Sequence, residues 1–202
     1  MRKSNYDKFP AIAVPDSAGA AVTGWPAIAD RLRRAGEGRG ARRTVLVVEC
    51  YPGVDETAVR GELARHLTPA LTIAASEALL PPDKIDALVA PFLGGDDPVF
   101  GFLSGLTLPQ FFDAGKLAGL RAQAAAVAEG LVLVVGCGAR LVVEGDLLVY
   151  ADLARWEAQL RFRRNESANL GAANHTLAAS LRYKRAFFVD WRVADRWKRP
   201  LI

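Results

Sequence analysis

Short apolar runs alternate along the chain with longer amphipathic stretches, and this alternation predicts the fold. Thr44–Glu49 (TVLVVE) and Leu131–Val135 (LVLVV) are rich in β-branched residues and show no polar alternation. Such runs are typical of strands that are buried on both faces of a parallel sheet, so we expect both to be central strands. Leu71–Ala75 and Leu147–Ala151 are two further predicted strands, and Phe187–Asp190 is a short last one.

The stretches between these runs have helical spacing or helix-start signals. The predicted helices are Gly24–Arg34, Asp55–Leu67, Asp83–Phe92, Asp113–Glu129, Asp152–Asn165, Gly171–Arg185 and Arg192–Lys198. Asp83 is expected to cap its own helix, and Asp55 lies in a first turn, where the backbone dipole favours an acid. Loops are expected at Gly36–Arg43 and Gly94–Gly105. Strands that alternate with helices predict an α/β fold, with a doubly wound, mostly parallel sheet and helices on both faces.

The composition supports one globular domain. The chain has 202 residues, of which 51% are hydrophobic and 24% charged. A single domain over residues 1–202 is expected, with an N-terminal arm and helix (1–40), a core sheet (44–152) and basic lid-like and C-terminal helices (153–202). Cys50 and Cys137 end apolar runs and are expected to be buried thiols in a reducing cytoplasm. The polar first ten residues lack the apolar core of a signal peptide, and the longest uncharged run, Pro98–Phe112, is too short to span a membrane.

Basic residues gather in the C-terminal quarter. The net charge is +4, and Arg155–Arg199 contains eleven Arg and Lys against four Asp and Glu. This excess predicts an anionic partner: a phosphorylated ligand, a nucleic acid or an acidic protein surface. No recognised nucleic-acid-binding signature is present, so nucleic acid is the least favoured of the three. Trp191 and Trp197 are expected to pack against a following domain rather than to stack on bases, and Trp156 is expected in the core.

The turn after Thr44–Glu49 is the first place to look for a ligand, because ligands of doubly wound sheets bind at the carboxyl ends of strands. A working phosphate loop reads G-x-x-x-x-G-K-[ST], in which the glycines expose backbone N–H groups and the lysine neutralises phosphate. Here the segment from Glu49 to Thr57 reads ECYPGVDET. One glycine, Gly53, remains, carboxylates stand where the lysine is expected, and Pro52 removes one N–H donor. These changes disfavour the usual mode of triphosphate binding.

The carboxylates of this turn have two interpretations. Glu49, Asp55 and Glu56 could hold a cation or a hydroxyl group of a ligand. Alternatively, the segment is an ordinary N-capped helix that follows a decayed phosphate loop.

Any anion site is expected between this turn and the basic helix over 152–165. Free N–H groups at a helix N-terminus bind anions, and arginines three apart on a helix can clamp a phosphate with forked hydrogen bonds. The residues of this expected phosphate-binding site are Tyr51, Gly53, Val54, Arg161 and Arg164. In the competing interpretation the two arginines form ion pairs with Glu157 and Glu166 on a solvated helix face.

Three segments resemble uridine-kinase-like P-loop enzymes. VFGFLSGLTLPQFFD (Val99–Asp113) is similar to their D-x-F-x-x-P…F-D segment, and LVLVVGCGARL (Leu131–Leu141) lies where they have a strand that ends in a glycine-containing turn. LLVYADLARWEAQLRFRRN (Leu147–Asn165) is similar to their I-Y-V-D…R-x-x-R-R segment, a strand that runs into a lid helix. The resemblance implies a P-loop nucleoside-kinase-like fold with lid arginines that reach phosphate. By this resemblance the lid arginines are Arg161, Arg163 and Arg164.

The segments MRKSNYDKFP, VVECYPGVDE, YADLARWEAQLRFRR and FFVDWRVADRWKR carry a narrower resemblance. They resemble the N-terminal region of longer bacterial proteins called class I mannose-6-phosphate isomerase-like, in which a zinc-binding cupin domain follows. A zinc site needs about four ligands, whereas this chain has two histidines, His66 and His175, far apart and on predicted helices. The isomerase activity implied by that name is therefore not expected here, and neither is a metal or another cofactor.

Together these observations favour a non-catalytic, kinase-like domain of a mannose-6-phosphate isomerase-like protein. Such a domain would bind a phosphorylated sugar or nucleotide, or would serve in assembly. The alternative is an active sugar or nucleoside kinase with an atypical phosphate loop. No catalytic residue is predicted.

Overall fold

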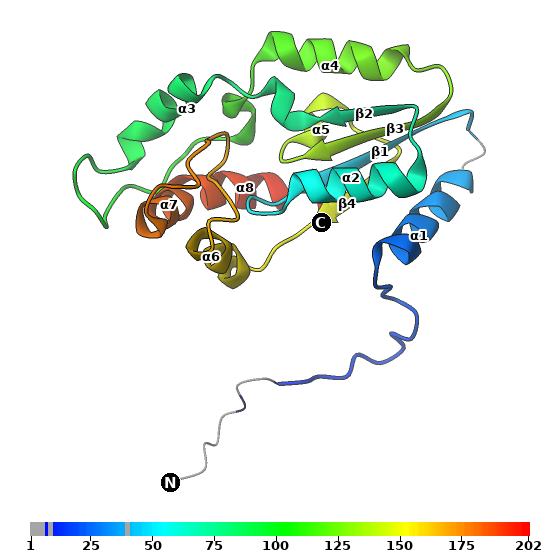
Figure 1. Ribbon diagram of the computed structural model, residues 1–202, viewed down its shortest axis with the longest axis horizontal. Coiled ribbons are helices and arrows are strands. Elements are labelled where there is room, and N and C mark those ends of the chain that lie inside the picture. The colour runs from blue at the N-terminus through cyan, green and yellow to red at the C-terminus, as the bar shows by residue number, and fades with distance from the viewer. Residues whose placement is uncertain (1–6, 8–9, 39–40) are drawn as a thin grey trace.

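The computed structural model describes residues 7, 10–38 and 41–202, and it contains a four-stranded sheet (Figure 1). The strands are β1 (Arg43–Cys50), β2 (Leu71–Ala74), β3 (Gly130–Gly136) and β4 (Leu147–Ala151). They lie in the order β2-β3-β1-β4, and every neighbouring pair is parallel. The predicted α/β class is confirmed, and the two β-branched runs that lack polar alternation form the central strands as expected.

Helices cover both faces of this sheet, so the fold is doubly wound. The helices are α1 (Trp25–Glu37), α2 (Glu56–Leu67), α3 (Pro82–Val89), α4 (Ala114–Ala126), α5 (Ala139–Val142), α6 (Arg155–Arg163), α7 (Ala179–Arg185) and α8 (Trp191–Lys198). Single turns of 3₁₀-helix lie at η1 (Ala75–Ala78), η2 (Ala90–Phe92) and η3 (Leu108–Phe111), and a π-helix, η4 (Ala186–Asp190), joins α7 to α8. Among the described residues, no helix is both long and apolar enough to cross a membrane.

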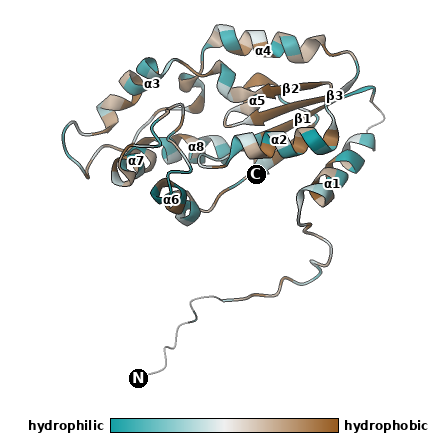
Figure 2. Ribbon diagram, in the orientation of Figure 1, coloured by the Kyte–Doolittle hydropathy of each residue, from teal (hydrophilic) through white to brown (hydrophobic). Residues whose placement is uncertain are grey.

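The two faces of the sheet bury alternate residues of the same strands. Val45 and Val47 of β1 face a core that α3, α4, α5 and α8 complete, whereas Leu46 and Val48 face α1 and α2. All four side chains are buried, which is why the sequence shows no polar alternation in this strand. Figure 2 shows the strands in the hydrophobic colour, with helices of mixed hydrophobic and hydrophilic colour around them.

Two predictions for the C-terminal part are wrong. The helix expected over Gly171–Arg185 begins only at Ala179, so His175 lies in a loop. Phe187–Asp190, expected as a strand, belongs to the π-helix that continues α7 into α8. A short apolar run does not by itself distinguish a strand from a buried helical turn.

Smaller corrections concern where helices begin and end. Helix α6 begins at Arg155 rather than Asp152, and Pro81 rather than Asp83 holds the N-cap position of α3. Gly36 and Glu37, expected in a loop, extend α1. Residues 39–40 of that expected loop, and most of the expected N-terminal polar arm, lie outside the described residues.

The tryptophans also differ from expectation. Trp191 is 1% exposed and packs inside this chain, so it is available neither to a following domain nor to nucleobases. Trp197 is half-buried against the core on the α8 side of the sheet. Trp156, expected in the core, is 60% exposed.

The central position of β3 gives a direct test of the fold. Leu133 is fully buried between β1 and β2, and truncating it leaves a cavity in both the sheet and its packing against α2. We expect Leu133→Ala to lower the free energy of unfolding by about 2–5 kcal/mol in urea denaturation. Leu148→Ala, on the partly exposed edge strand β4, is the matched control and should cost less than about 1 kcal/mol. Equal costs would contradict the strand order.

Candidate functional site at the carboxyl ends of the central strands

A cleft of about 630 Å³ opens at the carboxyl ends of β1 and β3. It lies at the switch point of the sheet, because the chain leaves β1 for β2 on one side and leaves β3 for β4 on the other. Ligands of doubly wound sheets bind at such points. The cleft is lined by the turn before α2, the segment before α3 and the loop before α7, with residues 52–56, 79–82 and 166–173.

Backbone hydrogen bonds close the turn before α2 and join it to β4. The Tyr51 N–H donates to the Ala151 carbonyl at 2.9 Å, and the Val54 N–H donates to the Tyr51 carbonyl at 3.0 Å. Asp55 caps α2, since its Oδ1 accepts the Ala58 N–H at 2.9 Å. Gly53 takes a φ of +100°, which favours glycine. The ordinary N-capped helix is therefore the interpretation of Asp55 that the structure confirms.

The expected phosphate-binding residues of this turn are only partly in the cleft. Gly53 and Val54 line it. Tyr51 is buried on the other side of the turn, where its hydroxyl donates to Asp195 at 2.8 Å and accepts from Arg155 at 3.2 Å. Burial is the main reason that the Tyr51 pKa is raised to about 12. Its backbone N–H is already bonded and is not free to bind an anion.

Glu49 binds the backbone of the neighbouring β3–α5 turn. Its carboxylate accepts the Gly138 N–H at 2.5 Å and the Arg140 N–H at 2.9 Å. These donors belong to the turn that opens α5, where backbone N–H groups converge as they do in anion-binding nests. Glu49 is 1% exposed. Burial raises the Glu49 pKa above its ordinary value, although the two backbone hydrogen bonds partly offset that rise.

Glu56 binds the same turn from the first residue of α2. Its Oε1 accepts the Cys137 N–H at 2.8 Å. Burial raises its pKa, and the hydrogen bond from Cys137 opposes the rise. Two carboxylates of this chain therefore occupy three backbone donors of this turn, the N–H groups of Cys137, Gly138 and Arg140, which we call the cradle.

Two glycines let the turn approach these carboxylates. Gly136 lies opposite Glu49 in the β1–β3 register and has a φ of +137°. A Cβ at Gly136 would lie 2.9 Å from Glu56 Oε2. Gly138 has a φ of +85°, and a Cβ there would lie 2.5 Å from the Phe112 ring. Both positions need glycine for conformation and for space.

The two cysteines beside this cradle are free thiols and both are buried, as expected. Burial is the main cause that raises the pKa of each thiol, and the nearby carboxylates raise it further. Such thiols are inert rather than nucleophilic. Among the described residues, no group of three or more His, Cys, Asp and Glu is arranged to hold a metal ion.

The two arginines of the expected phosphate clamp form hydrogen bonds with other residues of this chain. Arg161 donates to Glu157 at 3.1 Å and to the Gly53 carbonyl at 2.9 Å. Arg164 donates to Glu157 and to Glu166, at 2.8 Å each. The structure thus joins Arg161 to the turn, as expected, but both arginines form the competing ion pairs. Hydrogen bonds from Arg164 are the first cause that lowers the pKa of Glu157 and of Glu166.

Three further polar side chains complete the walls of the cleft. Lys116 of α4 donates to the Leu79 carbonyl at 3.1 Å, and Glu166 and His175 come from the loop before α7. With Asp55 and Glu56 on the opposite wall, the lining holds three carboxylates, one lysine and one histidine.

A buried polar network, not foreseen from the sequence, holds the loop before α7. Arg182 donates to the carbonyls of Ser167 and Phe162, at 2.9 and 2.6 Å. The buried Asp190 accepts from Asn169 at 2.6 Å, and burial is the main cause that raises its pKa. Arg185 of α7 completes the network with a bond to the Leu170 carbonyl at 2.7 Å. Both arginines belong to the basic C-terminal quarter that predicted an anionic partner, and only their helical spacing from Val189 indicates burial in the sequence.

The chain belongs to a family described as "Domain of unknown function (DUF8485)", whose model matches residues 24–202. No curated protein matches the chain.

The raised pKa of Glu49 predicts how stability depends on pH. Its contribution is fully present below the ordinary value of 4.5 and is lost as the pH rises through the folded-state pKa. We therefore expect the unfolding free energy of the wild type, relative to Glu49→Gln, to fall as the pH rises above about 4.5 in urea denaturation. Glu166→Gln is the contrasting variant: the Glu166 pKa is lowered, so its difference should fall as the pH falls. If the two stability differences changed with pH in the same direction, they would contradict the opposite pKa shifts of Glu49 and Glu166.

Removal of Glu56 should create an anion site. Glu56→Ala leaves the Cys137 N–H without its acceptor at the wall of the cleft, so a small anion can replace the carboxylate. We expect formate or phosphate to raise the melting temperature of this variant more than that of the wild type, measured at constant ionic strength. Glu62→Ala, which removes a carboxylate from the same helix, is the control and should respond like the wild type. An equal response of all three proteins would contradict the conclusion that Glu56 occupies the Cys137 N–H in place of an anion.

Proposed function

We propose that this member of the DUF8485 family is a non-catalytic domain on a kinase-like α/β scaffold, with a role in binding and assembly. One observation carries the proposal: Glu49 and Glu56 already occupy the backbone N–H groups next to the position where a kinase holds phosphate. A phosphate bound to those N–H groups would have to displace the buried carboxylate of Glu49 and the partly buried carboxylate of Glu56.

Electrostatics supports the same conclusion. Catalysis of phosphoryl transfer consists almost entirely of positioning and of charge stabilisation by cations and backbone donors. In this cleft Asp55, Glu56 and Glu166 face the space that a polyphosphate would fill. Like charges repel, so each of these carboxylates opposes the binding of a polyphosphate in the cleft. The cation Lys116 comes from α4 rather than from the turn, and its ammonium group bonds to a backbone carbonyl.

A phosphorylated sugar is the second candidate ligand, and Lys116 and His175 favour it because both line the cleft. A monophosphate at that wall avoids the carboxylates of the turn. For the clamp expected from the sequence, Arg161 and Arg164 would have to exchange Glu157 for the ligand. The active sugar or nucleoside kinase would need the same exchange and a cation in place of Asp55, and nothing in the cleft favours it.

The assembly role is supported by the resemblance to the leading region of isomerase-like proteins. Under this proposal a zinc-binding cupin domain follows in the longer protein and carries the isomerase chemistry. The two free thiols fit a reducing compartment, and we propose the cytoplasm.

The proposal predicts the absence of kinase activity. We expect no ATP hydrolysis and no phosphoryl transfer to sugars or nucleosides with magnesium-ATP, because the turn has no cation for the β- and γ-phosphates. A sensitive assay of phosphate release measures this. Turnover that Asp55→Asn abolishes would contradict the proposal.

Titration calorimetry with mannose 6-phosphate, ATP and inorganic phosphate separates the candidate ligands. Salt-sensitive binding of the sugar phosphate that Arg161→Ala and Arg164→Ala both weaken would support the clamp. Arg34→Ala, an exposed arginine on α1, is the matched control. Binding that only Lys116→Ala weakens would place the phosphate at the opposite wall of the cleft.

A further inference from the structure

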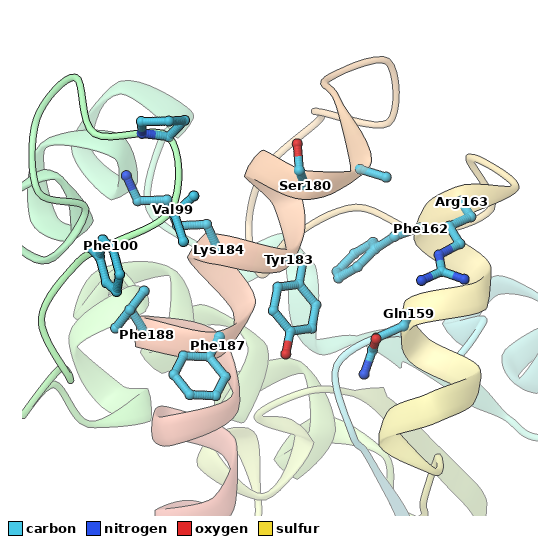
Figure 3. Close-up of a pocket in the computed structure, with 12 residues that line it drawn as sticks. Val99, Phe100, Gln159, Phe162, Arg163, Ser180, Tyr183, Lys184, Phe187 and Phe188 are labelled. Atoms are coloured by element: carbon cyan, nitrogen blue, oxygen red, sulfur yellow. The ribbon is translucent and has the colours of Figure 1, made fainter.

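A second hollow, which we call the aromatic groove, lies away from the cleft. It has a volume of about 590 Å³ and lies between α6 and the continuous helix of α7 and η4, with the loop over 98–100 at one end. Figure 3 shows rings from these elements directed into it. The aromatic residues that line it are Phe100, Phe162, Tyr183, Phe187 and Phe188. Gln159, Arg163 and Lys184 supply most of its polar groups.

The apolar surface continues beyond the groove along the neighbouring loop. Val99, Phe100, Phe102 and Leu103 are each more than half exposed, at 61, 70, 66 and 63%. The loop is nevertheless held in place: Asp97 accepts the N–H groups of Val99 and Phe100, and Lys184 donates to the Asp97 carbonyl. Contiguous exposed side chains of this size mark an interaction surface.

The same chain exposes a short segment that suits such a groove. Pro10–Pro15 reads PAIAVP, and within it Ile12 is 85% exposed and Val14 is 67% exposed. Two prolines favour the extended polyproline conformation, which docks against aromatic-lined grooves at a low cost in conformational entropy.

The place where this segment leaves the body is fixed. Arg31 of α1 donates to the Ala20 carbonyl at 2.8 Å, and Ser17 donates to the Val14 carbonyl at 2.7 Å. From there the segment runs outward (Figure 1). Within one chain the groove and the Pro10–Pro15 segment are therefore both exposed. The groove offers aromatic rings, and the segment offers the apolar side chains and prolines that pack against such rings.

We propose that the aromatic groove binds the Pro10–Pro15 segment of a second copy of this chain, so that two copies exchange segments reciprocally. Ile12 and Val14 enter between the rings of α6 and the α7–η4 helix, and the prolines hold the segment extended. This inference rests on the assembly role proposed above and does not involve the cleft. A small apolar ligand is the competing occupant of the groove, and the following experiment separates it.

Sedimentation equilibrium of the full chain over a wide concentration range tests the exchange. We expect the wild type to form a dimer, and we expect Ile12→Asp with Val14→Asp, or Phe100→Asp alone, to weaken dimerisation at least tenfold. All three side chains are largely exposed, so the variants should keep the wild-type melting temperature. Val22→Asp, which removes an exposed residue outside the segment, is the control and should leave the dimer unchanged.

A mixture of the two variants gives the sharper readout. The segment variant keeps an intact groove, and the groove variant keeps an intact segment, so their mixture should recover association that neither shows alone. A wild type that stays monomeric at every concentration, or a dimer that the segment variant leaves intact, would overturn the proposal. The second result would still leave an assembly role, and the phosphate-release assay tests the absence of catalysis independently of both.

Discussion

The contact between the Glu49 carboxylate and the N–H groups of Gly138 and Arg140 determines the arrangement at the carboxyl end of the sheet. Burial of a charged group costs several kcal/mol, and hydrogen bonds to a charged group return about 1.5–3 kcal/mol each. The bond joins the end of β1 to the start of α5. Because α5 leads directly into β4, it also fixes the crossing that places β4 beside β1. The same contact therefore joins β1 to the connection that leads to β4, and it occupies two N–H groups of the cradle.

The chemical consequence is that side chains of this chain already bind the backbone N–H donors at the switch point. A doubly wound sheet presents backbone donors at the carboxyl ends of its strands, and a ligand normally completes them. Here carboxylates from β1 and α2 do so. Arg161, which donates to the carbonyl of Gly53 in the turn, is also paired with Glu157. The wall formed by the loop before α7 is held by Arg182 and Asp190 and does not depend on a ligand.

The central strands could be predicted because burial on both faces imposes a continuous apolar run, and α2 could be predicted because Asp55 marks its start. The role of Glu49 could not be predicted. In the sequence, a carboxylate at the end of a strand gives the same pattern whether it faces a ligand or a backbone turn more than 80 residues away. The burial of Arg182 and Trp191 could not be predicted from the sequence for a similar reason. Their partners are carbonyls and rings from distant segments, which leave no local pattern. The ion pairs of Arg161 and Arg164 were foreseen as one of two interpretations because their acids lie within a helical turn or next to it.

The most direct test of an internally filled cradle is a nuclear magnetic resonance titration of the backbone amides. The account predicts that the Cys137, Gly138 and Arg140 amide protons shift together as Glu49 and Glu56 titrate, with midpoints above the ordinary glutamate value of 4.5. It also predicts that the same resonances do not move when millimolar phosphate or ATP is added at neutral pH. Amide shifts that saturate with phosphate or ATP, without a matching response to pH, would show that the cradle is open to ligands and would contradict the account.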